Sequence, residues 1–143
     1  MGDLYFTVES DRVFRIPAIR LVEAQQGHGA PTFMYRFDWA SPAMGGALGA
    51  CHGLELGFVF GLTDRKGMEP FAGGGPEARA LSDVMIDAWV AFARTGDPSH
   101  PGLPGGRWDA YAAPERKTML LDRVCALELD PAGAEREAWQ DIL

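Results

Sequence analysis

The chain has 143 residues, the length of one ordinary domain, and its 47% hydrophobic and 23% charged residues are close to the average for globular proteins. This composition argues against a disordered acidic tail and against a membrane protein. Its 13 Lys and Arg against 20 Asp and Glu give a formal charge of −7, and no basic run is longer than Arg65-Lys66 or Arg116-Lys117. Nucleic acid and anionic membrane surfaces are therefore not expected as partners.

The N-terminus and the cysteines are the basis for what we expect of the cellular compartment and of a cofactor. Residues 1–3, Met-Gly-Asp, lack the basic and apolar regions of a signal peptide, and the longest uncharged stretch, residues 40–54, falls short of the ~20 apolar residues that a membrane span needs. Cys51 and Cys125 lie far apart without zinc-type spacing, which is typical of a reducing compartment. We expect a cytoplasmic protein that needs no cofactor and no metal.

The first half of the chain predicts a helix, a strand and a long loop. Ser10-Asp11 resembles a helix cap, and apolar residues then recur at about 3.6-residue spacing until Gly27 and Gly29. From Thr32 to Trp39 the period changes to two, with aromatic residues on one side, which predicts a strand. Residues 40–53 are rich in glycine and have no period, so they predict a loop. Residues 54–60 fit either a short helix or a buried strand.

The second half predicts a long amphipathic helix, two short strands and a final helix. After a loop at residues 67–75, Pro76 begins a helix that ends at Gly96 and Pro98, and its apolar stripe includes Trp89 and Phe92. Strands are expected at residues 118–121 and 124–129, after a loop at 100–106, and a helix at 131–143. This order of elements indicates an α/β fold in a single domain, residues 1–143.

Three histidines are candidates for chemistry. His28 lies between two glycines and His100 precedes a proline, so both are expected to be solvated turn residues. His52 ends the glycine-rich loop after a strand, which is where ligands and catalytic groups collect in α/β sheets. On this context alone, a structural and a functional His52 remain equally open. A metal site made of Cys51, His52, Glu55 and one other histidine has no known ligand spacing, and no metal or redox site at Cys51-His52 is expected.

The segment at residues 49–61, GACHGLELGFVFG, resembles the catalytic-histidine segment of type B carboxylesterases, the cholinesterase-like family of α/β hydrolases. Three further segments agree in the same order, and Trp108, Tyr111 and Trp139 continue the likeness. The three segments are Asp11 to Ala24, Ala30 to Trp39, and residues 87–98, DAWVAFARTGDP. The resemblance covers essentially the whole chain and corresponds to the family's C-terminal portion. It implies the C-terminal part of an α/β-hydrolase fold with an incomplete central sheet.

The resemblance also implies a role for His52. It matches the histidine of a Ser-acid-His triad, which takes the serine proton during attack and returns it to the leaving alcohol. None of the four serines lies in a G-x-S-x-G motif; they are Ser10, Ser41, Ser82 and Ser99. No oxyanion-hole stretch is present, and the acid of the family's triad lies upstream. Glu55 is interpreted as a helix-start or loop-bracing carboxylate. We therefore expect His52 to be a catalytic histidine. The chain alone should hydrolyse no ester, and it should meet an ester substrate only when an N-terminal portion completes it.

Two further expectations concern partners. The alternative to a hydrolase segment is a non-catalytic interaction module on a hydrolase-derived scaffold. In the parental fold, the neighbours of the aromatic strand at residues 32–39 come from upstream residues. An unpaired apolar strand edge promotes association, so we expect self-association or a partner chain.

Overall fold

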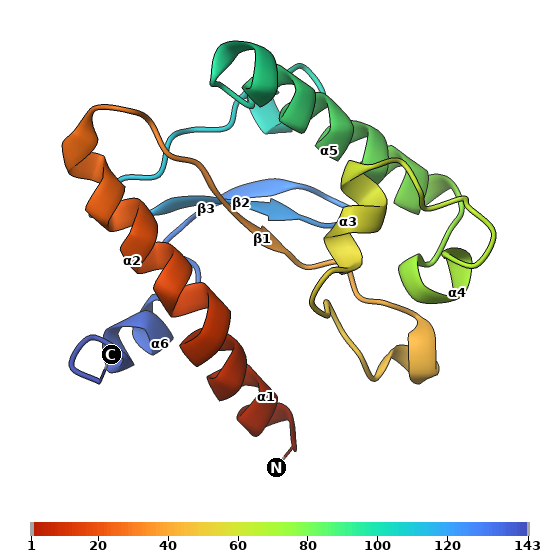
Figure 1. The fold of residues 1–143 in the computed structure, drawn as a ribbon, viewed down its shortest axis with the longest axis horizontal. Coiled ribbons are helices and arrows are strands. Elements are labelled where there is room, and N and C mark those ends of the chain that lie inside the picture. Colours follow the sequence, from red (N-terminus) through yellow and green to blue (C-terminus); the bar gives the residue numbers. More distant parts are fainter. Residues whose placement is uncertain (1, 143) are drawn as a thin grey trace. The chain divides into compact units, whose positions relative to one another are not determined.

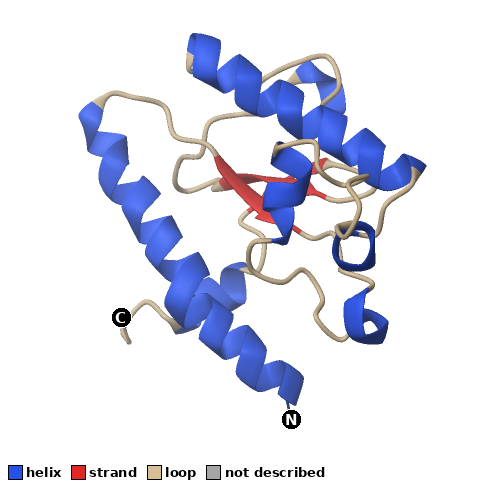
Figure 2. Cartoon of the chain, turned by 45° about the vertical axis from the view of Figure 1, so that its right-hand side comes forward, coloured by secondary structure: helices blue, strands red, loops and turns tan. Residues whose placement is uncertain are grey.

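The computed structural model describes residues 2–142, which form helices and one three-stranded sheet with the strand order β1-β2-β3 (Figures 1 and 2). The helices are α1 (Gly2–Ser10), α2 (Ile16–Gln25), α3 (Leu54–Val59), α4 (Glu69–Ala72), α5 (Pro76–Thr95) and α6 (Gly133–Ala138). The strands are β1 (Met34–Phe37), β2 (Lys117–Leu121) and β3 (Ala126–Leu129). The expected mixture of helices and strands is confirmed.

The chain forms two compact units. The first contains the described residues up to Met34, residues 110–118, and the described residues from Leu129 onward. The second contains residues 35–109 and 119–128. Among residues 2–142, no helix is both long and apolar enough to cross a bilayer.

The N-terminal helix of the first unit begins earlier than the sequence predicts. Ser10 is itself helical (φ −63°, ψ −41°) and its side chain makes no cap bond, so the expected start at Ser10-Asp11 is wrong. Asp11 instead binds Arg15 one turn later through two hydrogen bonds of 2.6 and 2.8 Å, within a π-helical turn at Asp11–Arg15. Its carboxylate is therefore not available to cap a helix. Pro17 lies in the first turn of α2, where its missing N–H does no harm.

Many apolar side chains of α1 and α2 are exposed. Phe14 and Leu21, which the periodicity assigns to a buried face, are 53% and 71% exposed, whereas Ile16 is buried. Five more large apolar residues are exposed along the same helical segment; we call the seven together the α1–α2 apolar set: Leu4, Tyr5, Phe6, Val8, Val13, Phe14 and Leu21. The predicted apolar face is thus wrong at Phe14, Ala18 and Leu21, which are all exposed.

The strand β1 is shorter than predicted, and the buried aromatic residues extend past its end. The strand covers Met34–Phe37, and Asp38 continues the pairing by donating its N–H to the Leu121 carbonyl at 2.9 Å. Trp39 is buried, its indole N–H donates to the Ala72 carbonyl at 2.9 Å, and its ring lies 5.3 Å from that of Phe58. Tyr35, expected on the same face, is 36% exposed.

Residues 54–59 form the helix α3, which resolves the ambiguity left by the sequence. Leu54 and Phe58, four residues apart, are both fully buried. The Ser82 hydroxyl of α5 donates to the Phe58 carbonyl at 2.7 Å, and α3 packs against α5 (Figure 1). The core of this unit therefore includes the segment that directly follows His52.

The long helix α5 is confirmed at both ends. Pro76 begins it, and Gly96 ends it with a left-handed backbone (φ +78°) and an N–H bond to the Phe92 carbonyl. Its buried residues all lie between Ala78 and Ala88, where α3 packs. Phe92 in the last turn is 50% exposed, so its assignment to the core is wrong; Trp89 is half-buried.

The remaining elements differ from the prediction mainly at their ends. The helix α4 lies inside the expected loop at residues 67–75, and it was missed because it is only four residues long. The predicted strands are present as β2 and β3 with slightly different bounds. The predicted helix at residues 131–143 is reduced to α6, where Arg136 binds back to Asp130 just before the helix.

Candidate active-site histidine segment

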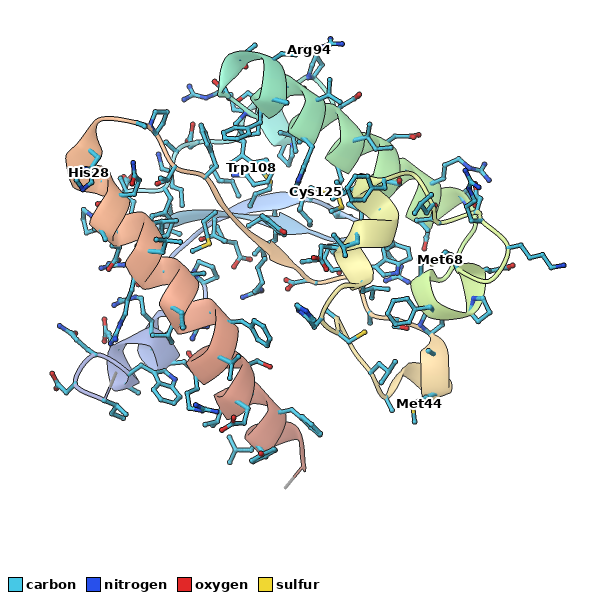
Figure 3. All side chains as sticks on the ribbon, in the orientation of Figure 1. His28, Met44, Met68, Arg94, Trp108 and Cys125 are labelled. Atoms are coloured by element: carbon cyan, nitrogen blue, oxygen red, sulfur yellow. The ribbon has the colours of Figure 1, made fainter. Side chains whose placement is uncertain are left out.

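The loop between β1 and α3 is closed by Ser41. The Ser41 N–H donates to the Gly49 carbonyl at 2.9 Å. The Ser41 hydroxyl, almost fully buried, donates to the Phe71 carbonyl at 2.5 Å and accepts the Ala43 N–H at 3.2 Å. These bonds attach the loop to α4 while leaving its tip outside, where Met44 is 78% exposed (Figure 3). The predicted glycine-rich loop is confirmed, although it contains a short 3-10 turn at Ala43–Gly46.

His52 lies in the turn that connects this loop to α3. The Leu54 N–H donates to the Cys51 carbonyl at 3.2 Å, which closes the turn around His52. Gly53 takes the left-handed conformation (φ +80°) that lets the chain enter α3 directly. The His52 side chain is exposed, whereas Leu54 two residues later is fully buried. The backbone at His52 is therefore held by its neighbours, and its imidazole is accessible from outside the chain.

Glu55 lies in the first turn of α3, which is one of the two positions that the sequence left open for it. A carboxylate at this position interacts favourably with the partial positive charge of a helix N-terminus. Its charge also acts on the ring of Tyr35: burial raises the pKa of Tyr35, and the Glu55 carboxylate raises it further. Glu55 thus contributes to the local field in the second unit.

The other two histidines have different surroundings. His28 is exposed in the turn after α2, as expected (Figure 3). The expectation of a solvated turn is wrong for His100, whose side chain is only 8% exposed. Its Nδ1 accepts the Gly102 N–H at 3.2 Å, and its buried Nε2 has no hydrogen-bond partner among the described residues. The Pro101-Gly102 turn folds the backbone against the imidazole ring, so that a Cβ on Gly102 would lie 2.9 Å from it.

Three serine hydroxyls are engaged in holding the second unit together. Ser41 and Ser82 are buried and donate to main-chain carbonyls, and the Ser99 hydroxyl accepts the Trp108 N–H at 3.0 Å. Ser10 lies exposed in α1. The structure thus assigns these three serines to packing and loop closure.

Neither cysteine forms part of a metal cluster in the described part of the chain. No group of three or more His, Cys, Asp or Glu side chains among residues 2–142 is arranged to hold a metal ion. Cys51 and Cys125 are both free thiols, and burial raises the pKa of the Cys125 thiol.

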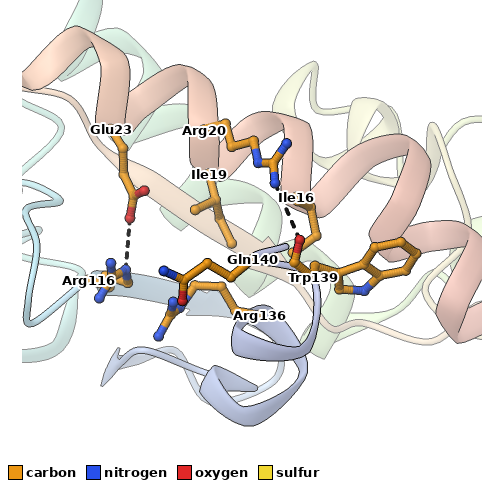
Figure 4. A pocket seen from close by; sticks show the side chains of 8 residues that line it. All are labelled: Ile16, Ile19, Arg20, Glu23, Arg116, Arg136, Trp139 and Gln140. Atoms are coloured by element: carbon orange, nitrogen blue, oxygen red, sulfur yellow. Dashed lines mark hydrogen bonds and ion pairs between the residues drawn. The ribbon is translucent and has the colours of Figure 1, made fainter. Parts of the chain in front are cut away.

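A cavity that the sequence did not predict lies in the first unit, and His52 does not line it. It has a volume of about 240 Å³, and three arginines, Arg20, Arg116 and Arg136, contribute to its wall (Figure 4). The three come from separate parts of the chain, and no local motif connects them. Only the fold brings these guanidinium groups together.

Comparison with known proteins decides the family. The family model for carboxylesterases matches residues 2–135. The chain belongs to the carboxylesterase family. Its resemblance to this family, noted around residues 49–61, is thereby confirmed.

The carboxylesterase relatives agree with this assignment in sequence. Para-nitrobenzyl esterase of Bacillus subtilis (strain 168) is 39% identical over 130 residues, which are 90% of this chain and 25% of that protein. Liver carboxylesterase of Sus scrofa is 31% identical over 146 residues, covering 99% of this chain and 24% of the relative. The chain thus spans about a quarter of the length of these curated relatives.

Solved carboxylesterase structures agree as well. The Geobacillus stearothermophilus carboxylesterase EST55 matches 95% of this chain and 27% of its own, with a TM-score of 0.82 and 38% identity. An esterase from Clostridium hathewayi matches 92% of this chain and 25% of its own, with a TM-score of 0.77 and 27% identity. The fold is therefore part of an α/β-hydrolase fold, and its sheet has three strands among the described residues.

Proposed function

We propose that His52 is the general base of a carboxylic-ester hydrolase site, and that residues outside this chain supply the rest of that site. Membership of the carboxylesterase family supports ester hydrolysis as the reaction class. The observation that carries the proposal is the placement of His52. Its backbone is fixed between the Ser41–Gly49 bond and the buried Leu54, and its imidazole remains exposed.

The proposed chemistry requires three groups from elsewhere. His52 accepts the proton of a serine hydroxyl while the serine oxygen attacks the ester carbonyl, and it then protonates the leaving alcohol. An acid must orient the imidazole, and oxyanion donors must stabilise the tetrahedral intermediate. The chain contains no G-x-S-x-G motif, and Ser41, Ser82 and Ser99 are committed to other bonds. Accordingly, the purified chain should hydrolyse short p-nitrophenyl esters no faster than buffer does.

Reconstitution tests the proposal. The part of Bacillus subtilis para-nitrobenzyl esterase that precedes its match to this chain is produced separately and mixed with the purified chain. We expect p-nitrophenyl ester hydrolysis in the mixture, with His52 as the general base. His52→Gln should lower kcat by about a thousandfold or more, since the triad acts as a unit. His28→Gln, which changes an exposed histidine in the first unit, should leave the activity unchanged.

Two results would overturn the proposal. Equal activity of the mixture with His52→Gln would show that another group is the base. Hydrolysis by the chain alone that disappears in His52→Ala would indicate a nucleophile within the chain, of which Cys51 beside His52 is the first candidate.

The second candidate function is a non-catalytic interaction module, and the α1–α2 apolar set favours it. Leu4, Phe6 and Leu21 are each about 70% exposed, and burying such a side chain is worth ~1.5–3 kcal/mol, so the helices favour a covering partner. The same surface would serve a completing hydrolase segment. The two functions are separated by the reconstituted mixture: a stable complex without hydrolysis supports the module, and hydrolysis that depends on His52 supports the enzyme.

A further inference from the structure

The cavity of the first unit combines an apolar wall with a cluster of guanidinium groups (Figure 4). Ile16 and Ile19 of α2 and the indole of Trp139 supply the apolar part, and Gln140 adds an amide. The charged residues in the lining are three arginines and one glutamate: Arg20, Arg116, Arg136 and Glu23. A volume of about 240 Å³ is below the ~300–1,000 Å³ of drug-sized sites, so an occupant is small.

Two of the three guanidinium groups are already neutralised within the protein. Arg116 donates to Glu23 at 2.8 Å, and Glu23 also accepts the hydroxyl of Tyr111 at 3.3 Å. Arg136 binds both carboxylate oxygens of Asp130, at 2.9 and 2.8 Å. These pairs hold the wall of the cavity in place and leave little of their charge for a ligand.

Arg20 differs from the other two. Its guanidinium donates to the Trp139 carbonyl at 3.4 Å, a long bond to a neutral acceptor. Within residues 2–142, no carboxylate lies within ion-pair distance of Arg20. The cavity therefore contains one positive charge that the described part of the chain does not neutralise, although the chain as a whole carries −7.

Asp130, the partner of Arg136, has further arginines nearby. The Arg136 guanidinium holds the pKa of Asp130 below its usual range, and the charges of Arg116 and Arg15 lower it further. Arg15 itself also donates to the carbonyls of Pro131 and Ala132, next to α6. The charges of Arg136 and Arg15 are thus used within the protein, and Arg20 remains the charge that an anion in the cavity would meet.

We propose that this cavity binds a small organic monocarboxylate. Its carboxylate lies on Arg20, and its apolar part lies against Trp139, Ile16 and Ile19. A guanidinium matches a carboxylate with two parallel N–H···O bonds, and one unneutralised guanidinium balances one negative charge. Inorganic phosphate, a mixture of monoanion and dianion at neutral pH, makes no use of the apolar wall. The proposal does not depend on the role of His52.

Binding to the full chain tests the proposal, with benzoate as the probe. Ligand-observed NMR titration should show saturable binding of benzoate, which weakens with added salt because the contact is ionic. Benzamide has the same shape without the charge, and inorganic phosphate has charge without the apolar body. We expect both to bind at least about tenfold more weakly, the range for one charge-assisted hydrogen bond.

Variants identify the residues responsible. Arg20→Gln should weaken benzoate binding by about tenfold or more, since it removes the charge and keeps a polar side chain of similar reach. Because Arg20 is exposed, this variant should retain the far-ultraviolet circular dichroism of the parent. Arg94→Gln changes an exposed arginine in the second unit and should bind benzoate as the parent does. Trp139→Leu should weaken benzoate while preserving the preference for it over benzamide.

Several outcomes would overturn the inference. One is benzoate binding without saturation, and another is binding of benzamide or phosphate that is as tight as that of benzoate. Unchanged benzoate affinity in Arg20→Gln would place the carboxylate elsewhere. Equal loss in Arg94→Gln and Arg20→Gln would show that only the net charge of the chain matters.

Discussion

The main-chain N–H of Ser41 donates to the carbonyl of Gly49 across 2.9 Å, and this bond closes the loop that leads to His52. Ser41 is 1% exposed, and its hydroxyl bridges the Phe71 carbonyl and the Ala43 N–H. This buried serine thus fixes where the loop of residues 40–53 begins and how it curves; we call this segment the histidine loop. Its chemical role is structural even though the family uses a serine nucleophile.

Ser41→Ala should lower the free energy of unfolding by about 1–3 kcal/mol, because it leaves the partly buried Phe71 carbonyl and Ala43 N–H without their partner. Urea unfolding followed by circular dichroism measures this change. Ser10→Ala is the matched control, since Ser10 is exposed and makes no side-chain cap bond. A loss in Ser41→Ala no larger than that in Ser10→Ala would contradict the structural role.

Gly53→Ala should destabilise the chain by about 1–2 kcal/mol, because a Cβ disfavours the left-handed backbone at this position. The space around Gly53 is open, so the cost comes from the backbone and not from a clash. Gly27→Ala provides the control: Gly27 also has open space but lacks a left-handed φ. Thermal unfolding should show a lower midpoint for Gly53→Ala only, and equal midpoints would refute the backbone argument.

Tyr111 should be the last tyrosine to ionise. Burial and the nearby Glu23 raise its pKa to about 12, above the usual value of 10.0, because both disfavour the charged phenolate. The folded-state pKa is raised, so the stability that Tyr111 contributes is complete below pH 10 and is lost as the pH rises towards 12. Tyrosinate absorbance during an alkaline titration should contain a late step that Tyr111→Phe removes. A late step that remains in Tyr111→Phe would assign it to another tyrosine.

The isolated chain should associate with itself. The α1–α2 apolar set consists of seven exposed large side chains. The free energy gained by burying them exceeds the entropic cost of ordering a few side chains at the contact. Size-exclusion chromatography with light scattering should show species larger than the 15.5 kDa monomer. Phe6→Lys combined with Leu21→Lys should shift them towards the monomer, whereas Val124→Lys, at an exposed apolar site in the second unit, should not. A monodisperse parent of 15.5 kDa would contradict this expectation.

Periodicity and turn residues predicted those parts of the fold in which local signals and packing agree. The helix α5 has a proline at its start, a glycine after its end and an apolar stripe between them, and both of its ends are confirmed. The helix start at Ser10-Asp11 was wrong because Asp11 binds Arg15 instead of a main-chain N–H. Local sequence cannot distinguish these two uses of one carboxylate.

Features that depend on residues far apart in the chain could not be predicted from the sequence. His100 is buried because the Pro101-Gly102 turn folds against its ring, and composition had suggested a solvated loop. The arginine cavity joins Arg20 to Arg116 and Arg136, which are about a hundred positions away. For His52, the sequence indicated the glycine-rich loop and the family, and the structure adds the bonds that hold this loop in place.

The indole of Trp39 and the hydroxyl of Ser41 bind the carbonyls of consecutive residues in α4, Ala72 and Phe71. The histidine loop and α4 therefore form one cooperative opening unit: a fluctuation that releases the loop breaks the attachments at the end of this helix at the same moment. An opening of this unit therefore also removes the attachments that hold the loop before His52. Its position is thus controlled by two side chains that precede it by more than ten residues.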